Sequence, residues 1–383
     1  MKKKNILQIN HSFAMGGVES MIVQLSNNID STQCDLSVCS IADDLEMTKR
    51  LINNVPVYCL GYKIKQIRGW RLILNFVFVI CKLGKLIKQV DPDIVHVHSY
   101  FTHYLFMALA VRFYSPKTIV VKTIHTSGLF YRNDTPINKF RVLVEKIATS
   151  LNKTHLVAIS GEVMQQTKDL FSKSAVDIHL IYNGVDIDKF KKQPQDALKK
   201  RLLGNQKILA VYVARVVEGK NHLFLVSLWK EMAEKGRRDI RLLIVGDGEL
   251  KEIVETEINN AGLTDEIVCI GRSNEVPQIL SACDFALFPS DYEGFSISLI
   301  EYMCSSLPVL CSDIPPFREV VKDGINGYII PLSQPELWTE RIMNIADDND
   351  LRKTIGDNAY RRSKNFSAEI MANNYTKLYY AIG

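Results

Sequence analysis

The chain has 383 residues, of which 47% are hydrophobic and 23% charged, with 47 lysines and arginines against 42 aspartates and glutamates. A chain of this length exceeds the size at which one hydrophobic core keeps growing, which predicts two domains. The composition excludes a disordered or low-complexity protein, and a net charge of +5 is too small to indicate nucleic-acid binding.

The sequence has no feature that indicates secretion or a membrane span. Eight cysteines are scattered without the spacing of a metal site, and the lysines after Met1 lead directly into a predicted strand instead of a signal peptide. The longest apolar stretch, 72–81, is shorter than the roughly 20 residues that cross a bilayer. We expect a cytoplasmic protein with reduced cysteines.

Short apolar runs alternate with helix-length segments along the chain, as in βαβ units whose parallel sheet is buried on both faces. The turn at Asn183-Gly184 and the lysine-rich segment after it, up to Arg201, predict a linker. The predicted strands are 5–10, 35–40, 56–60, 94–98, 118–125, 155–159 and 178–181 before the linker, and 207–214, 241–245, 267–270, 285–289 and 308–311 after it.

These elements predict an α/β protein with two doubly wound, Rossmann-like domains that face each other across a cleft. We assign 1–185 to an N-terminal domain, 186–365 to a C-terminal domain, and 366–383 to a terminal helix that packs back on the N-terminal domain. Ligands of such sheets lie at the carboxyl ends of the strands, so residues just after strands are the candidates for a site.

The stretch from Phe288 to Glu301 carries the strongest signal, because a strand ends there and a helix is expected to begin near Ser296. The helix N-terminus offers free N–H groups and a positive dipole end to an oxygen-rich ligand. Glu293 and Glu301 would lie about 12 Å apart if the stretch were helical throughout, which suits two ends of one extended ligand. Ordinary surface charge is the alternative explanation of this spacing.

Arg215 and Lys220 follow the first strand of the second domain. A guanidinium and an ammonium group at a strand end can bracket a diphosphate and neutralise a leaving group. A solvated loop with two cations explains the pattern equally well.

Glycines and histidines at strand ends are weaker signals. Gly16-Gly17 and Gly246 would let the backbone approach a ligand closely, without a full dinucleotide-binding motif. His125 ends a predicted strand, but His96 and His98 also lie at a strand end, so the pattern does not single out one histidine.

In this order and spacing, the motifs resemble those of the retaining GT-B glycosyltransferases of family 4 (glycosyl transferases group 1), of the bacterial capsular and exopolysaccharide type. The resemblance covers nearly the whole chain. It rests on Gly16-Gly17, His125, the segment 183–186, Arg215 with Lys220, the turn 246–248, and the pair Glu293 and Glu301. The alanine before Arg215, and Ser296 and Ser298, differ from residues that are common in the family.

The resemblance implies a role for each residue. Glu293 and His125 would be catalytic residues that contact the transferred sugar, and Glu301 would bind the donor ribose. The remaining substrate-binding residues would be Arg215 and Lys220 on the diphosphate, Gly16 and Gly17 near the phosphate, Gly246, and the backbone amides of Phe295, Ser296 and Ile297.

The resemblance also implies transfer of a hexose or N-acetylhexosamine from a UDP-sugar to a glycan or lipid-linked acceptor, with retained configuration and no cofactor. A divalent metal would be the alternative to the cations. Asp-x-Asp triples occur at Asp91/Asp93, Asp186/Asp188 and Asp348/Asp350. Each has an ordinary explanation as a strand entrance, a turn or an acidic run, so we expect no metal site.

The span 62–90 mixes lysine and arginine with aromatic and aliphatic residues. It fits a helix on the anionic inner surface of a membrane, and equally a core helix with solvated basic ends. Other functions also stay open: a nucleotide-sugar epimerase, which needs no acceptor; a phosphorylase, which needs inorganic phosphate; or a non-catalytic nucleotide-sugar-binding subunit.

Overall fold

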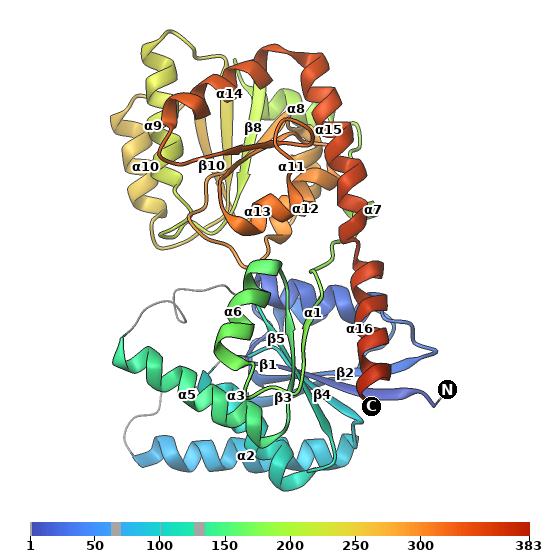
Figure 1. Cartoon of the computed structure of the whole chain (residues 1–383). Coiled ribbons are helices and arrows are strands. Elements are labelled where there is room, and N and C mark those ends of the chain that lie inside the picture. Colours follow the sequence, from blue (N-terminus) through green and yellow to red (C-terminus); the bar gives the residue numbers. More distant parts are fainter. Residues whose placement is uncertain (1, 63–69, 100, 126–134) are drawn as a thin grey trace. The chain divides into compact units, whose positions relative to one another are not determined.

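The computed structural model describes residues 2–62, 70–99, 101–125 and 135–383, and the chain divides into two compact units (Figure 1). Unit 1 comprises Met1–Gly184 and Ala368–Gly383, and unit 2 comprises Val185–Ser367. Each unit is built on a parallel sheet that is flanked by helices.

The sheet of unit 1 has the strand order β3-β2-β1-β4-β5-β6-β7 among the described residues. Its strands are β1 (Lys4–Asn10), β2 (Cys34–Ala42), β3 (Val57–Tyr62), β4 (Ile94–Val97), β5 (Ile119–Ile124), β6 (His155–Ala158) and β7 (Ile178–Leu180). Its helices are α1 (Gly17–Asn28), η1 (Glu46–Arg50), α2 (Trp70–Val90), α3 (Phe101–Tyr114), α5 (Pro136–Leu151), α6 (Gly161–Phe171) and α16 (Ala368–Ile382). The order reverses between β1 and β4, which is the switch point of a doubly wound sheet.

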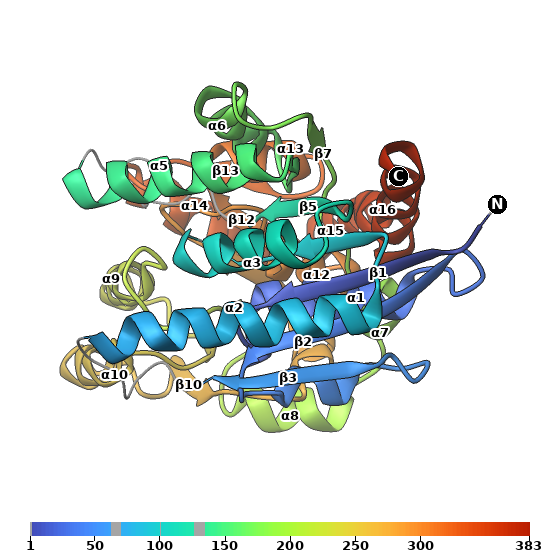
Figure 2. The ribbon, with the colours of Figure 1, turned by 90° about the horizontal axis from the view of Figure 1, so that it is seen from below.

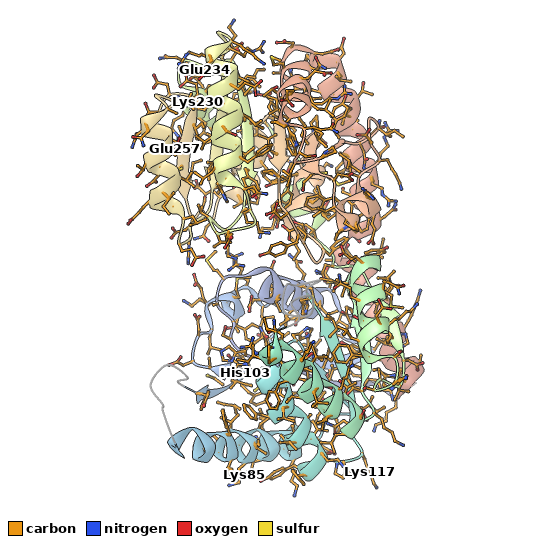
Figure 3. All side chains as sticks on the ribbon, turned by 60° about the vertical axis from the view of Figure 1, so that its left-hand side comes forward. Lys85, His103, Lys117, Lys230, Glu234 and Glu257 are labelled. Atoms are coloured by element: carbon orange, nitrogen blue, oxygen red, sulfur yellow. The ribbon has the colours of Figure 1, made fainter. Side chains whose placement is uncertain are left out.

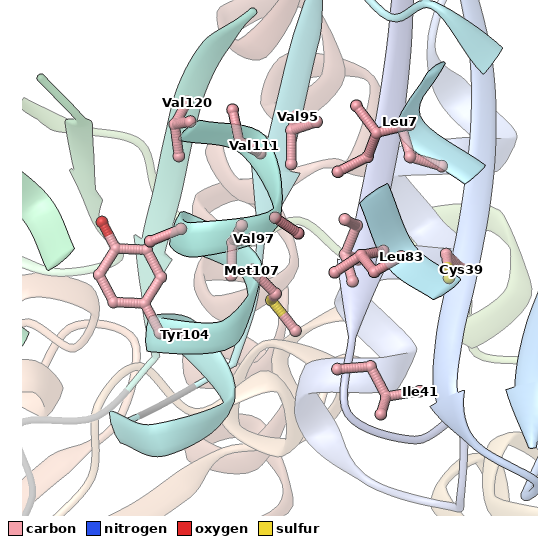
Figure 4. Close-up of a cluster of buried hydrophobic side chains, with 14 of the residues drawn as sticks. Leu7, Cys39, Ile41, Leu83, Val95, Val97, Tyr104, Met107, Val111 and Val120 are labelled. Atoms are coloured by element: carbon pink, nitrogen blue, oxygen red, sulfur yellow. The ribbon is translucent and has the colours of Figure 1, made fainter. Parts of the chain in front are cut away.

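Helices α2, α3 and α5 pack side by side over one face of this sheet (Figure 2). Val95 and Val97 of β4 point to that face and belong to a buried cluster with Leu83 of α2 and Met107 of α3 (Figure 4). Successive strand residues point to opposite faces, so His96 lies on the other face. His96, the one polar residue of β4, therefore faces away from α2 and α3.

The terminal helix α16 belongs to unit 1 and packs against α1. Tyr375 and Tyr379 lie one turn apart on it, and both are buried. The Tyr379 hydroxyl hydrogen-bonds His96 Nδ1 at 2.7 Å, and the Tyr375 hydroxyl hydrogen-bonds Thr123 Oγ1 at 2.9 Å. The last helix of the chain is thereby fixed to β4 and β5 by buried polar contacts.

Unit 2 has the parallel strand order β10-β9-β8-β11-β12-β13, with its switch point between β8 and β11. Its strands are β8 (Ile208–Val213), β9 (Ile240–Val245), β10 (Ile267–Gly271), β11 (Phe285–Phe288), β12 (Val309–Ser312) and β13 (Tyr328–Ile330). Its helices are α7 (Ile187–Phe190), α8 (Asp196–Leu203), α9 (His222–Glu234), α10 (Lys251–Asn260), α11 (Val276–Ala282), α12 (Ile297–Cys304), α13 (Pro315–Val320), α14 (Pro335–Asp347), α15 (Asn349–Ser363) and η3 (Lys364–Phe366).

The α/β fold class is confirmed, and the predicted strands end within two residues of those in the structure. The segment up to Arg201, predicted as a linker, instead contains α7 and α8. Helix α8 has no buried residue, so no apolar stripe indicated it. Strand β13 was not predicted because three residues are too few for an alternating pattern.

Candidate functional site

Three loops of unit 2 follow the neighbouring strands β8, β9 and β11 at their carboxyl ends. The loop after β8 carries Arg215 and Lys220, the loop after β9 carries Gly246, and the loop after β11 carries Glu293. Because the strand order reverses between β8 and β11, these residues lie where doubly wound sheets bind ligands.

The glycines of the turn 246–248 hold the Arg215 loop in place. A Cβ atom at Gly246 would overlap the carbonyl oxygen of Ala214, and one at Gly248 would overlap that of Val216. The Ala214 N–H donates to the carbonyl of Val245, the last residue of β9, at 3.1 Å, and the Val216 N–H donates to the carbonyl of Asp247 in the turn at 3.0 Å. Glycine is required at both positions because the backbones of the loops after β8 and β9 lie against each other. The exposed Arg215 lies between Ala214 and Val216, whose positions are fixed by these contacts.

Lys220 forms an ion pair with Glu293, and their side chains are only 17% and 14% exposed. Ser290 Oγ donates to the same carboxylate oxygen at 3.1 Å, and the Tyr212 hydroxyl donates to the Lys220 carbonyl at 2.8 Å. Charge-assisted bonds of this kind are stronger than neutral ones. Glu293 thus holds the Lys220 ammonium group, and Tyr212 of β8 holds the Lys220 backbone.

Asn221 ties the same two loops together. It adopts a left-handed conformation with φ of 56°, and its Nδ2 donates to Pro289 O and to Asp291 Oδ1, both at 2.7 Å. The Asp291 N–H in turn donates to Gly219 O at 2.9 Å. The loops after β8 and β11 thus form one hydrogen-bonded frame.

The ion pair between Lys220 and Glu293 makes Lys220 different from Arg215. The sequence pattern made Arg215 and Lys220 equivalent, but the structure balances the Lys220 charge with Glu293. An ammonium group has three N–H donors, so Lys220 can keep Glu293 and still donate to an anion. Glu293 is thus placed to orient Lys220, in addition to the sugar contact that the family resemblance implies.

Helix α12 begins at Ile297, close to the start that the sequence predicted. Its N-cap residue Ser296 makes no side-chain capping bond, so the first N–H groups of the helix are not capped by that hydroxyl. Phe295 and Ser296 are buried, and the Phe295 ring packs on Phe366 with centroids 5.5 Å apart. These two residues therefore offer a ligand their backbone more than their side chains.

Glu301 is the fifth residue of α12, whereas Glu293 lies in the loop before it. The 12 Å separation that assumes a helix throughout does not apply, because only the last part of the stretch is helical. Within unit 2, the structure places both glutamates on the strand-loop-helix element that follows β11.

Gly16, Gly17 and His125 belong to unit 1. Gly16 is the N-cap of α1 and Gly17 its first residue. A Cβ atom at Gly17 would meet no atom within 4 Å, so open space surrounds this start of α1 within the described residues. Gly16 is crowded by the Glu19 side chain, whose Oε1 accepts from Asn10 Nδ2 at 3.0 Å.

His125 ends a chain of buried hydrogen bonds. Its Nε2 lies 3.0 Å from His98 Nδ1, and His98 Nε2 lies 3.0 Å from Gln8 Oε1. Gln8 Nε2 donates to Ser26 Oγ at 3.1 Å, and Ser26 Oγ donates to Ile22 O at 2.7 Å. The chain runs from helix α1 across β1 and β4 to the end of β5.

The directions of these bonds fix the tautomer of His125. The Ser26 proton goes to the Ile22 carbonyl, so Ser26 accepts from the Gln8 amide, and the Gln8 oxygen faces His98. His98 must then donate from Nε2 and accept at Nδ1, which makes His125 the donor through its Nε2. The Nδ1 of a neutral His125 is left as a hydrogen-bond acceptor.

Burial keeps this histidine neutral. Desolvation, with a smaller effect of the Lys122 charge, lowers the pKa of His125 to about 3, and desolvation holds the pKa of His98 well below its usual value. Near neutral pH, His125 can accept a hydrogen bond from a hydroxyl group but cannot donate a proton as an acid.

The sequence analysis did not predict a role for Gln8. Its one indication in the sequence is a glutamine between the apolar residues of a buried strand.

A buried ion pair lies on the face of β5 opposite to that of His125. Lys122 Nζ is 2.9 Å from Glu145 Oε1 of α5, and the two side chains are 1% and 0% exposed. The ammonium group also lies 4.0 Å from the centroid of the Tyr104 ring. The sequence analysis did not predict this ion pair. Its one indication in the sequence is Lys122, a lysine within a mostly apolar strand.

Family models match both halves of the chain. The model described as "Glycosyl transferases group 1" matches residues 194–362, and "Glycosyltransferase Family 4" matches residues 15–189.

Curated relatives are similar over most of their length. The chain is 28% identical, over 298 residues, to the N-acetylgalactosamine-N,N'-diacetylbacillosaminyl-diphospho-undecaprenol 4-alpha-N-acetylgalactosaminyltransferase of Campylobacter jejuni, covering 76% of this chain and 78% of that one. It is 27% identical, over 350 residues, to the UDP-Gal:alpha-D-GlcNAc-diphosphoundecaprenol alpha-1,3-galactosyltransferase of Escherichia coli, covering 88% and 86%.

A solved structure has the same fold. The Anabaena protein HepE in complex with UDP and glucose superposes with a TM-score of 0.81 at 18% identity, over 99% of this chain and 100% of that one.

Proposed function

Because this chain belongs to the group 1 and family 4 glycosyltransferases and has their GT-B fold, we propose that it transfers a hexose or N-acetylhexosamine from a UDP-sugar to a glycan or lipid-linked acceptor, with retention. The observation that carries the proposal is the frame of unit 2 in which Lys220 is oriented by Glu293 beside the exposed Arg215. Two cations at the switch point of a doubly wound sheet suit a diphosphate.

The relatives support the choice of donor and acceptor. HepE was solved with UDP and glucose, and the Escherichia coli relative is named for a UDP-linked galactose. Both curated relatives are named for acceptors on a diphospho-undecaprenol carrier. We therefore place UDP-sugars first as donors, and polyprenyl-diphosphate-linked sugars first as acceptors.

In the proposed reaction, the bond from the anomeric carbon to the diphosphate oxygen breaks while the acceptor hydroxyl attacks from the same face. The proton of that hydroxyl passes to the departing phosphate oxygen. Arg215, Lys220 and the first N–H groups of α12 stabilise the charge that develops on the diphosphate, and stabilisation of this kind usually contributes most to the rate of such reactions. Glu301 holds the ribose, and His125 accepts a hydrogen bond from a hydroxyl of the transferred sugar.

These cations replace a divalent metal in the proposal. One aspartate of each Asp-x-Asp triple makes a structural contact. Asp93 accepts from the Asn5 N–H at 2.9 Å, Asp186 caps α7, and Asp348 caps α15.

A donor screen followed by product analysis tests this function. We expect a UDP-hexose or UDP-N-acetylhexosamine to raise the unfolding temperature, since a ligand that binds the folded state stabilises it. Transfer to a lipid-linked acceptor should then proceed in EDTA, with retained anomeric configuration by NMR. Conversion of the donor without an acceptor would indicate an epimerase. A requirement for inorganic phosphate would indicate a phosphorylase, and donor binding without any turnover would indicate a non-catalytic binding subunit.

The outer face of α5 supports an acceptor at a membrane surface. Ile137, Phe140, Leu143 and Ile147 recur every three or four residues and are 54–64% exposed. Such a stripe on a helix that also carries cations suits the surface of an anionic bilayer. None of the described helices combines the length and hydropathy needed to cross a membrane.

Helix α2, which like α5 packs against α3, also has exposed apolar residues. Val77 and Phe78 of α2 are each 53% exposed. Lys85 of α2, and Lys117 just after α3, also lie at the surface of unit 1 (Figure 3). The lysines and arginine at 63, 65 and 68, part of the predicted basic span, lie outside the described residues. The inner side of α2 packs in the core through Leu83, and we propose the membrane contact for its exposed side alone.

Phe140→Glu combined with Ile147→Glu should abolish binding to vesicles that contain anionic lipid. The change places two charges on the apolar stripe without touching the core. Co-sedimentation at low salt measures the effect, and Ile253→Glu, at a 53% exposed position of α10, is the matched control. Equal vesicle binding by the double variant and the wild type would remove α5 from the proposal.

A further inference from the structure

Strands β6 and β7 bring three metal-ligating side chains together in unit 1. His155 is the first residue of β6, Asp177 directly precedes β7, and His179 lies within β7. One ligand atom of each residue lies within 4.8 Å of the other two. His155 Nδ1 lies 3.7 Å from Asp177 Oδ2.

The strand pairing holds the three residues in this arrangement. Val157 pairs with His179 in parallel register, so His155 lies opposite Asp177, and all these residues share one face of the sheet. Backbone bonds fix the start of the pairing, from Leu156 N to Asp177 O at 2.9 Å and from Val176 N to Thr154 O at 3.1 Å. The cluster is therefore set by the sheet and not by a mobile loop.

Two imidazole nitrogens of the group have unused bonding capacity. His155 Nδ1 and His179 Nε2 are shielded from solvent and have no hydrogen-bond partner among the described residues. The His155 side chain is 13% exposed and that of Asp177 60% exposed, so the cluster is open to solvent on the carboxylate side. Buried polar atoms of this kind normally have a partner, and a metal ion would supply one for both nitrogens.

We propose that His155, Asp177 and His179 bind a divalent transition-metal ion such as Zn²⁺. Two imidazoles and one carboxylate suit zinc, whereas Mg²⁺ and Ca²⁺ prefer oxygen ligands. Zinc bonds of about 2.0–2.2 Å place tetrahedral ligands about 3.3–3.6 Å apart, so modest side-chain rotations complete the site. Water fills the remaining position.

The site lies at the amino ends of β6 and β7, whereas His125 follows the carboxyl end of β5. The ion would join the edge strand β7 to β6 and stabilise unit 1 by binding the folded state. The proposal is independent of the transfer reaction, so the two can fail separately.

Titration of the tag-free, full-length protein with ZnCl₂ tests the site by calorimetry. We expect one Zn²⁺ per chain and a higher unfolding temperature with Zn²⁺ but not with Mg²⁺. Substituted Co²⁺ should give the visible spectrum of a nitrogen and oxygen site, without a thiolate charge-transfer band. His155→Gln and His179→Gln should each weaken binding by about 100-fold, since even the loss of a residue that only hydrogen-bonds a metal ligand costs about 10- to 100-fold.

Asp177→Asn is the variant least able to disturb folding, because the side chain is 60% exposed, and it should also weaken binding. His103→Gln removes a histidine that stacks on His11, with ring centroids 4.1 Å apart, and should bind Zn²⁺ like the wild type. The proposal is overturned if the wild type shows no saturable binding. It is also overturned if the variants at 155, 177 and 179 all retain wild-type affinity.

Discussion

Lys220→Ala should lower kcat for sugar transfer by about 100- to 1,000-fold, the loss that follows removal of one charged or polar group that stabilises a transition state. Lys220 lies in the frame between the loops after β8 and β11, where its ammonium group contacts Glu293. Without it, Glu293 adds a negative charge close to where the diphosphate is proposed to bind. The variant therefore loses an attraction and gains a repulsion. Steady-state rates at saturating donor measure the effect.

Two further variants separate these contributions. Lys220→Ala combined with Glu293→Gln removes the repulsion and should bind UDP more tightly than Lys220→Ala alone, because UDP carries the diphosphate but no transferred sugar. Lys235→Ala is the matched control, since Lys235 forms an exposed ion pair with Glu231 at the end of α9 in the same unit. A Lys220→Ala rate within about threefold of the wild type would contradict the role of Lys220 in leaving-group stabilisation.

Lys122→Met should lower the stability of unit 1 by about 3–5 kcal/mol, the usual cost of removing one partner of a buried ion pair. The Glu145 carboxylate is 0% exposed and would lose its 2.9 Å contact with Lys122. The Tyr104 ring would also lose its contact with the Lys122 ammonium group. The destabilisation arises from the loss of an ion pair with a fully buried carboxylate and not from lost apolar packing, because methionine keeps most of the side-chain volume.

Hydrogen exchange by mass spectrometry measures this prediction unit by unit, which avoids assuming that a two-unit chain unfolds in one step. Peptides from β4 and β5 should exchange faster in Lys122→Met, while peptides from β8 and β11 should not change. Lys122→Met with Glu145→Leu should recover most of the loss, since apolar pairs can replace buried ion pairs at little cost. If the single and double variants exchange alike, the buried Glu145 carboxylate is not the cause of the destabilisation.

The fold was largely predictable because most of its strands and helices can be recognised from the pattern of neighbouring residues. Buried parallel strands such as β4 and β8 are short apolar runs, and periodicity locates them within two residues. Helix α8 was missed because it buries no residue, and β13 because it has three residues. Local pattern fails where an element has little buried surface of its own.

The site was predictable in position but not in its contacts. Strand ends located Arg215, Lys220 and Glu293, yet the ion pair between the latter two joins residues 73 apart in the chain. The same holds for the hydrogen bond between Gln8 and His98, which are 90 residues apart. Contacts of this kind depend on strand order and side-chain direction, which the sequence did not determine. The roles assigned to Gly16, Gly17, Gly246 and the other site residues stay predictions.

The structure of the complex with an intact UDP-sugar, prepared in EDTA, would show directly whether protein cations hold the diphosphate. We expect both phosphates at the carboxyl ends of β8 and β11, within hydrogen-bonding distance of the Arg215 guanidinium and Lys220 ammonium groups. We expect the ribose at Glu301. A diphosphate bound elsewhere on the chain, or a donor that binds only when a divalent ion is restored, would contradict the proposed mechanism.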